Sequence, residues 1–134
     1  MRQLERAEQC AVIQWAALME RQYPELSLLF AIPNGGSRHR IEAFNLKRSG
    51  VRPGIPDLCL PVSRQGYHAL YIEMKSIKGK VSLKQEGLIT QLRVHGNYAE
   101  VCNSSIVANA ALYGIGSHLA IRMIAKRRRR ATTL

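Results

Sequence analysis

The stretch GIPDLCLPVSRQGYHALYIEMK, residues 54–75, places charged side chains inside two otherwise apolar runs. DLCLPV and YHALYIEMK flank SRQG, which is the pattern of a β-hairpin whose strands alternate between two faces. Charged side chains are almost never fully buried unless they are paired or hold a metal. Any fold for this chain must therefore give Asp57, Glu73 and Lys75 either partners or a chemical role.

The hairpin has a testable register. Directly opposed residues of an antiparallel pair have a constant index sum and point to the same face. If the turn centres near Gln65, Asp57 lies opposite Glu73, and Lys75 shares their face. The sequence therefore predicts two carboxylates and one ammonium at one end of the hairpin. A turn displaced by one residue would instead move Asp57 to the other face.

The net charge narrows the class of partner. The 134 residues include 20 Lys and Arg against 9 Asp and Glu, a formal net charge of +11. Such an excess favours a polyanion, because each phosphate contact releases condensed counterions. A membrane surface is disfavoured, since no basic helix carries a bulky aromatic face and no run of about 18 apolar residues could span a bilayer. Nucleic acid is the expected partner, and the absence of a secretory leader favours a cytoplasmic protein.

Periodicity predicts one α/β domain with the element order αβαββαβα, a mixed sheet flanked by helices. A helix is expected over 3–22, a buried strand over 28–33, and a second helix over 37–50 with partial core contacts from Ile41, Phe44 and Leu46. After the hairpin come a helix over 83–96, a strand over 97–103 and a last helix from Ser104 or Ser105. We expect the domain to cover residues 1–125, with a basic tail over 126–134.

Two further polar residues fall on helix faces that should be apolar. Glu8 lies in the middle of the first helix's apolar stripe, with Glu5 towards its edge, and Gln85 lies on the apolar face of the third helix. Together with the three hairpin residues, these side chains are more inward-facing polar groups than a core normally contains. Hard oxygen ligands of this kind suit Mg²⁺ or Mn²⁺ and phosphodiester hydrolysis. The alternatives are an N-terminal dipole role for Glu8 and a capping-box role with Ser82 for Gln85.

The motifs resemble a known family. Pro56-Asp57 followed by Glu73-Met74-Lys75 resembles the PD-(D/E)xK nuclease superfamily. With IPNGGSRHR, LKRSGVRPGIPDLCLPV and LKQEGLITQLRVHGNYAEVC around it, the chain is similar, over residues 3–113, to the virus-type replication-repair nuclease family, VRR-NUC, in its stand-alone phage and bacterial form.

The resemblance implies roles for particular residues and a restriction-endonuclease-like fold. Its metal ligands would be Asp57, Glu73, the carbonyl of Met74, and Glu8 from the first helix. Lys75 would be the catalytic lysine, Gln85 the glutamine that follows it, and Asn34 and Arg38 would lie near the scissile phosphate. From their own positions, we add further candidate DNA contacts: Arg40 near the start of the second predicted helix, and Lys78 and Lys80 in the loop after the hairpin.

The expected function is a Mg²⁺- or Mn²⁺-dependent endonuclease selective for branched DNA, because a domain this small has little surface for reading bases. The resemblance adds Holliday-junction-resolvase-like activity as a homodimer, in a bacterial or phage-infected cell. Two alternatives stay open: a flap or nicking nuclease directed by a replication or repair partner, and a catalytically inactive basic DNA-binding module.

Overall fold

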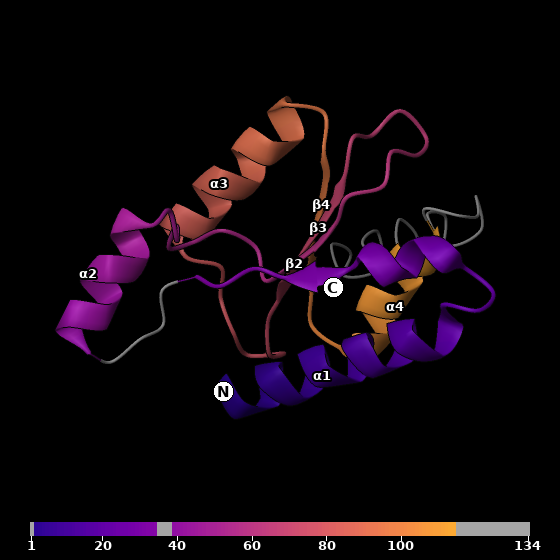
Figure 1. The fold of residues 1–134 in the computed structure, drawn as a ribbon, viewed down its shortest axis with the longest axis horizontal. Helices are drawn as coiled ribbons and strands as arrows, with labels where there is room; N and C mark the ends of the chain where they lie inside the picture. The colour runs from indigo at the N-terminus through magenta and orange to yellow at the C-terminus, as the bar shows by residue number, and fades with distance from the viewer. Residues whose placement is uncertain (1, 35–38, 115–134) are drawn as a thin grey trace.

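The structure, a computed structural model, describes residues 2–34 and 39–114 (Figure 1). Its elements follow the predicted order αβαββαβα, with one additional short 3₁₀ helix. In chain order they are α1 (Arg2–Met19), η1 (Pro24–Leu28), β1 (Phe30–Ala31), α2 (Arg40–Arg48), β2 (Leu58–Leu60), β3 (Leu70–Met74), α3 (Leu83–Val94), β4 (Tyr98–Cys102) and α4 (Ser105–Gly114).

The four described strands form one mixed sheet in the order β1-β2-β3-β4. β2 is antiparallel to both β1 and β3, whereas β4 runs parallel to β3. Leu58 pairs with Ile72 and Leu60 with Leu70, which is the register predicted for a turn centred near Gln65. At that turn Gln65 and Gly66 have φ of 51° and 84°. Positive φ at both central residues matches the twist of a two-residue hairpin, so the predicted hairpin is confirmed.

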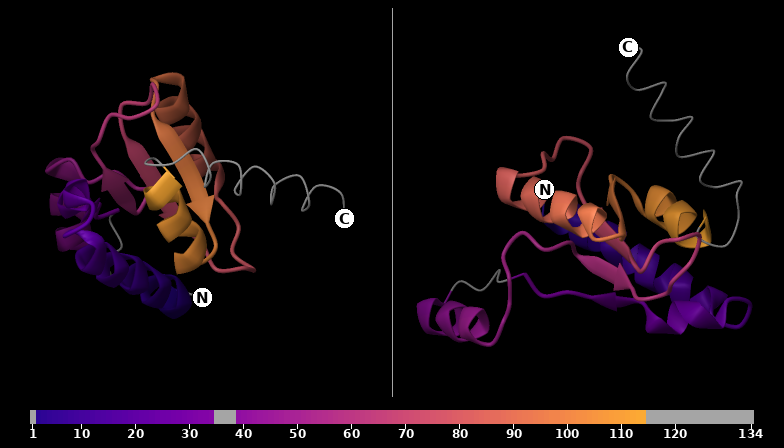
Figure 2. Two further views of the ribbon diagram at one scale, coloured as in Figure 1. Left: turned by 90° about the vertical axis from the view of Figure 1, so that its right-hand side faces the viewer. Right: turned by 90° about the horizontal axis from the view of Figure 1, so that it is seen from above.

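The sheet separates two layers of helix. Helices α1 and α4 pack together on one face, and α3 covers the other (Figures 1 and 2). The main core lies on the α1 and α4 side, where alternate residues of β3 join aliphatic side chains from β2, α1 and α4: Val12, Leu58, Leu60, Leu70, Ile72, Met74 and Leu112. Because side chains alternate along a strand, Glu73 points to the opposite, α3-covered face.

Two predicted segments differ from expectation. The strand predicted as buried over 28–33 is a two-residue edge strand, and Phe30 is 48% exposed because β1 pairs on one side only. The helix predicted over 37–50 is described from Arg40 and buries no residue: Ile41 and Phe44 are exposed, and Leu46 is half-buried. Figure 1 shows α2 at the edge of the molecule, away from the sheet, so the predicted core contacts are wrong for Ile41 and Phe44.

The last predicted helix is described up to Gly114. The domain boundary expected at residue 125 and the basic tail over 126–134 lie outside the described residues. Within the described part of the chain, no helix has the length and apolar character needed to cross a membrane.

Candidate active site

Asp57 is fixed at the end of the hairpin by contacts from both neighbouring strands. Its carbonyl accepts a hydrogen bond from Ile32 N at 2.8 Å, and its Oδ2 accepts one from Met74 N at 2.7 Å. Asn34 Nδ2 lies 3.5 Å from Oδ1, at the long limit for a hydrogen bond. Burial raises the pKa of Asp57, and the bond from Met74 opposes that rise. Asp57 thus lies across from the end of β3, as the register predicted.

Glu73 is the most deeply placed acid of the site, with 2% of its surface exposed. Its Oε1 accepts a hydrogen bond from Gln85 Nε2 at 2.9 Å and lies 3.6 Å from Lys75 Nζ. Its Oε2 is buried and has no hydrogen-bond partner among the described residues. Burial, followed by the negative charge of Asp57, raises the pKa of Glu73 to about 7. Glu73 Oε2 is therefore an acceptor without a donor in the described part of the chain, and burial disfavours the charged form of the same side chain.

Gln85 takes both roles weighed from the sequence. Its Oε1 accepts a hydrogen bond from Ser82 N at 2.9 Å, while Ser82 Oγ accepts one from Gln85 N at 3.2 Å. This reciprocal pair is a capping box at the start of α3. Because the amide oxygen is held by Ser82, the amide nitrogen is directed at Glu73. The helix cap thus sets the orientation of a donor in the site.

The acid of α1 that reaches this site is Glu5, whereas Glu8 is engaged elsewhere. Glu8 Oε2 accepts a hydrogen bond from Ser105 N, at the start of α4, and this bond lowers its pKa. Glu5 Oε1 accepts one from Ser76 N at 3.2 Å, just beyond β3, and its charge contributes to the raised pKa of both Asp57 and Glu73. The apolar stripe of α1 led to Glu8, and helical period alone gave no signal that favoured Glu5, which lies in the first turn.

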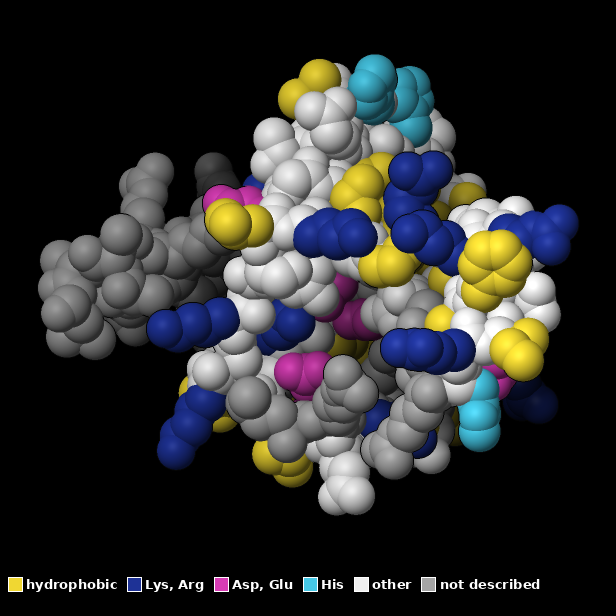
Figure 3. Space-filling view, turned by 90° about the vertical axis from the view of Figure 1, so that its left-hand side faces the viewer, with side chains coloured by type: hydrophobic (Ala, Val, Ile, Leu, Met, Phe, Trp, Pro, Cys, Tyr) yellow, Lys and Arg dark blue, Asp and Glu magenta, His cyan; other side chains and the backbone are white. Residues whose placement is uncertain are grey.

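Of the candidate DNA contacts, Asn34 touches an acid of the site, and the described Lys and Arg candidates are exposed. Lys78 and Lys80 are exposed in the loop after β3, Arg40 is exposed at the first residue of α2, and Asn34 contacts Asp57. Figure 3 shows acidic side chains in a hollow of one face with Lys and Arg side chains around it. Arg38 lies outside the described residues. The arrangement can hold a phosphate backbone across a carboxylate site.

The oxygen donors of the site are those that a hard divalent cation binds. Among the described residues, no three His, Cys, Asp or Glu side chains form a complete metal cluster. Mg²⁺ needs no such cluster, because it is usually bound through one or two carboxylates and keeps several waters. Asp57 and Glu73 supply two carboxylates, and the unpartnered Oε2 of Glu73 is the kind of oxygen that such a cation satisfies. The residues fit Mg²⁺ or Mn²⁺.

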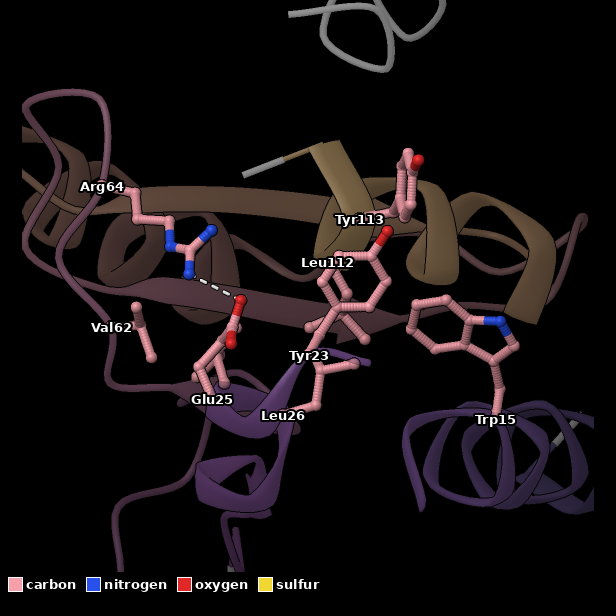
Figure 4. A pocket seen from close by; sticks show the side chains of 9 residues that line it. Trp15, Tyr23, Glu25, Leu26, Val62, Arg64, Leu112 and Tyr113 are labelled. Carbon is pink, nitrogen blue, oxygen red and sulfur yellow. Dashed lines mark hydrogen bonds and ion pairs between the residues drawn. The ribbon is translucent and has the colours of Figure 1, made fainter. Parts of the chain in front are cut away.

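A second hollow, on the side of η1 and α4, does not compete with this site. It is lined by Trp15, Tyr23, Tyr113 and an ion pair between Arg64 and Glu25 (Figure 4). Its volume of about 10 Å³ is room for about one water molecule. Its lining includes none of Asp57, Glu73 and Glu5.

Comparisons with known proteins agree with this geometry. The family model for the VRR-NUC domain matches residues 1–106. The chain therefore belongs to the VRR-NUC family, whose members are nucleases of the PD-(D/E)xK type and usually use divalent metals. A solved structure described as a VRR_NUC domain protein superposes with a TM-score of 0.70 at 26% identity, covering 84% of this chain and 87% of the other. A comparison with curated proteins gave no match.

Proposed function

We propose that this protein is a metal-dependent endodeoxyribonuclease that hydrolyses phosphodiester bonds in branched DNA, with a four-way junction as its substrate and a homodimer as its active form. The observation that supports this most is the convergence on Glu73: Gln85 and Lys75 approach one of its oxygens, and the other is buried with no partner among the described residues. Most buried side-chain oxygens have a hydrogen-bond partner, so an unpaired oxygen beside Asp57 and Lys75 supports a ligand-binding role for Glu73.

In this proposal Asp57, Glu73 and the Met74 carbonyl hold Mg²⁺ or Mn²⁺. We assign the accompanying acid of α1 to Glu5, because Glu8 caps α4. The cation, when bound, lowers the pKa of a water and offsets negative charge on the phosphate. Gln85 holds Glu73 in one orientation, and Asn34 steadies Asp57.

Lys75 is the proton-handling and charge-stabilising residue of the proposal. The Lys75 side chain is 15% exposed, and its Nζ lies 3.6 Å from Glu73 Oε1. From this position it can orient the attacking water in line with the leaving oxygen and stabilise the charge that develops on the phosphate. Arg38, Arg40, Lys78 and Lys80 are proposed to hold the neighbouring phosphates.

Selectivity for branched DNA follows from the size of the domain and the nature of its contacts. Phosphate contacts position a strand without reading its bases, so DNA shape is the available source of selectivity. A two-fold dimer would place two such sites on strands of opposite polarity. The exposed apolar residues of α2, Ile41 and Phe44, offer a surface for pairing of two copies.

A substrate panel tests the proposal. Labelled four-way junction, flap, fork and duplex DNA are incubated with Mg²⁺, Mn²⁺ or EDTA, and the molar mass is measured by sedimentation. Paired nicks on the junction with a dimeric mass are the expected result. Preferred flap cleavage by a monomer would overturn the junction assignment, and DNA binding without cleavage in either metal would overturn the enzymatic one.

A further inference from the structure

The two most exposed large apolar side chains in the described part of the chain lie at the two ends of one loop. Leu83 is 87% exposed and Ile77 is 86% exposed. The segment that contains them, residues 76–83, begins directly after Lys75 and ends at the first residue of α3. We call it the β3–α3 loop. Single exposed apolar residues are ordinary, but this pair flanks the candidate active site.

The β3–α3 loop has a defined shape because both of its ends are attached to the site. At its start, Gly79 N donates a hydrogen bond to Ser76 O at 2.9 Å, and Ser76 N donates to Glu5 Oε1 at 3.2 Å. At its end, the Ser82–Gln85 capping box directs Gln85 towards Glu73. The exposure of Ile77 and Leu83 is therefore a property of an anchored loop.

The charge of the segment indicates what covers these side chains. Residues 75–84, KSIKGKVSLK, contain four lysines and no aspartate or glutamate. Lys78 and Lys80 are exposed between the two apolar residues. A surface that alternates ammonium groups with aliphatic side chains complements nucleic acid, whose phosphates take the charges and whose base faces take the apolar groups.

We propose that the β3–α3 loop recognises unstacked bases next to the scissile phosphate, with Ile77 and Leu83 packing on base faces and Lys78 and Lys80 on the flanking phosphates. This inference rests on the proposed function and names the feature of the substrate that the enzyme selects. In a continuous duplex the base faces are covered by stacking, and inserting an aliphatic side chain requires unstacking a step. At a branch or a nick some faces are already exposed, so the contact forms there at lower cost.

The test reads binding and does not depend on cleavage. A four-way junction and a matched duplex carry 2-aminopurine at the branch point or the equivalent position, and fluorescence and affinity are measured in EDTA. The variants are Ile77→Ser, Leu83→Ser and the double substitution. Leu18→Ser is the matched control, because Leu18 is 81% exposed but lies at the far end of α1.

Wild type and Leu18→Ser should change the 2-aminopurine signal on the junction, whereas the double variant should lose that change and on the order of tenfold in junction affinity. Duplex affinity should be unaffected. Lys78→Ala with Lys80→Ala should instead weaken binding to both DNAs and lower its salt dependence.

The inference would be overturned if the double variant changed the 2-aminopurine signal as much as wild type does. It would also be overturned if wild type bound the junction without changing that signal. Either result would leave the proposed nuclease activity intact. A double variant that loses dimer mass in sedimentation but keeps its junction signal would assign the side chains to a protein interface instead. Absence of cleavage in Mg²⁺ with the signal present would count against the proposed function and not against this contact.

Discussion

The amide of Gln85 donates a hydrogen bond of 2.9 Å to Glu73, and the same side chain closes the cap of α3. A helix start and a deeply buried acid are thereby joined through one residue. The hydrogen bond from Gln85 orients Glu73 without any bound ligand. Side chains that bind metals are usually oriented by such a neighbouring hydrogen bond.

Gln85→Ala should weaken Mn²⁺ binding about 10- to 100-fold, because Glu73 loses the donor that orients it. Isothermal titration calorimetry with Mn²⁺ measures this without DNA. Ser82→Ala is the matched control: it removes the other side-chain bond of the capping box and leaves the Gln85 contact to Glu73 in place. Equal losses in the two variants would show that Gln85 acts only through the helix cap.

Glu73→Gln should stabilise the metal-free protein at neutral and higher pH. The pKa of Glu73 is raised from 4.5 to about 7 by burial, so over that range the folded protein holds a proton that the unfolded chain has released. The contribution of Glu73 to stability is full below pH 4.5 and falls as pH rises through 7, by at most about 1.4 kcal/mol per pH unit.

Urea unfolding in EDTA at pH 5 and pH 8 measures this effect. The difference in unfolding free energy between Glu73→Gln and wild type should increase towards pH 8. A difference that is the same at both pH values would mean that Glu73 keeps an ordinary pKa in the folded protein.

Glu5 and Glu8 should respond differently to the same substitution. Glu5→Gln should lower Mn²⁺ affinity and DNA cleavage with little effect on stability, because its carboxylate faces Asp57 and Glu73. Glu8→Gln should leave Mn²⁺ affinity near wild type and cost about 1 kcal/mol of stability, because it weakens the acceptor for Ser105 N at the start of α4. The reverse pattern would return the metal-site role to Glu8.

Gly79→Ala should impair the site although no catalytic group is altered. A Cβ at this position would lie 2.9 Å from Ser76 Oγ and 3.3 Å from Glu5 Oε1, so the loop or Glu5 must shift. We expect weaker Mn²⁺ binding by calorimetry. Gly87→Ala is the matched control, since its Cβ would meet no atom within 4 Å and an alanine inside α3 should stabilise the helix by about 1 kcal/mol. Wild-type Mn²⁺ affinity in Gly79→Ala would refute the contact between the loop and Glu5.

The hairpin and the third helix were predictable because their constraints are local. Opposed residues share a fixed index sum, so a turn at Gln65 was enough to bring Asp57 to Glu73, and helical period alone turned Gln85 inward. Which acid of α1 approaches Asp57 and Glu73 was not predictable in this way. Angular position ranks Glu8 above Glu5, but how far a helix extends beyond the sheet depends on tertiary packing.

The second helix shows where hydrophobic periodicity fails as a guide to burial. Ile41 and Phe44 have the spacing of a core-facing stripe, yet α2 buries neither. Periodicity reports that a helix has an apolar side and does not report what covers it. The same limit applies to LLFAIP, whose composition suits a buried strand and whose place at the sheet edge leaves Phe30 exposed.

Cleavage of a labelled four-way junction by wild type and Glu73→Gln, in Mg²⁺, Mn²⁺ and EDTA, tests the central claim most directly. Urea unfolding of Glu73→Gln at pH 8 shows whether a loss of activity in this variant reflects unfolding. The account predicts metal-dependent nicking by wild type and a loss of several orders of magnitude in the variant. Cleavage at the wild-type rate by Glu73→Gln would contradict it.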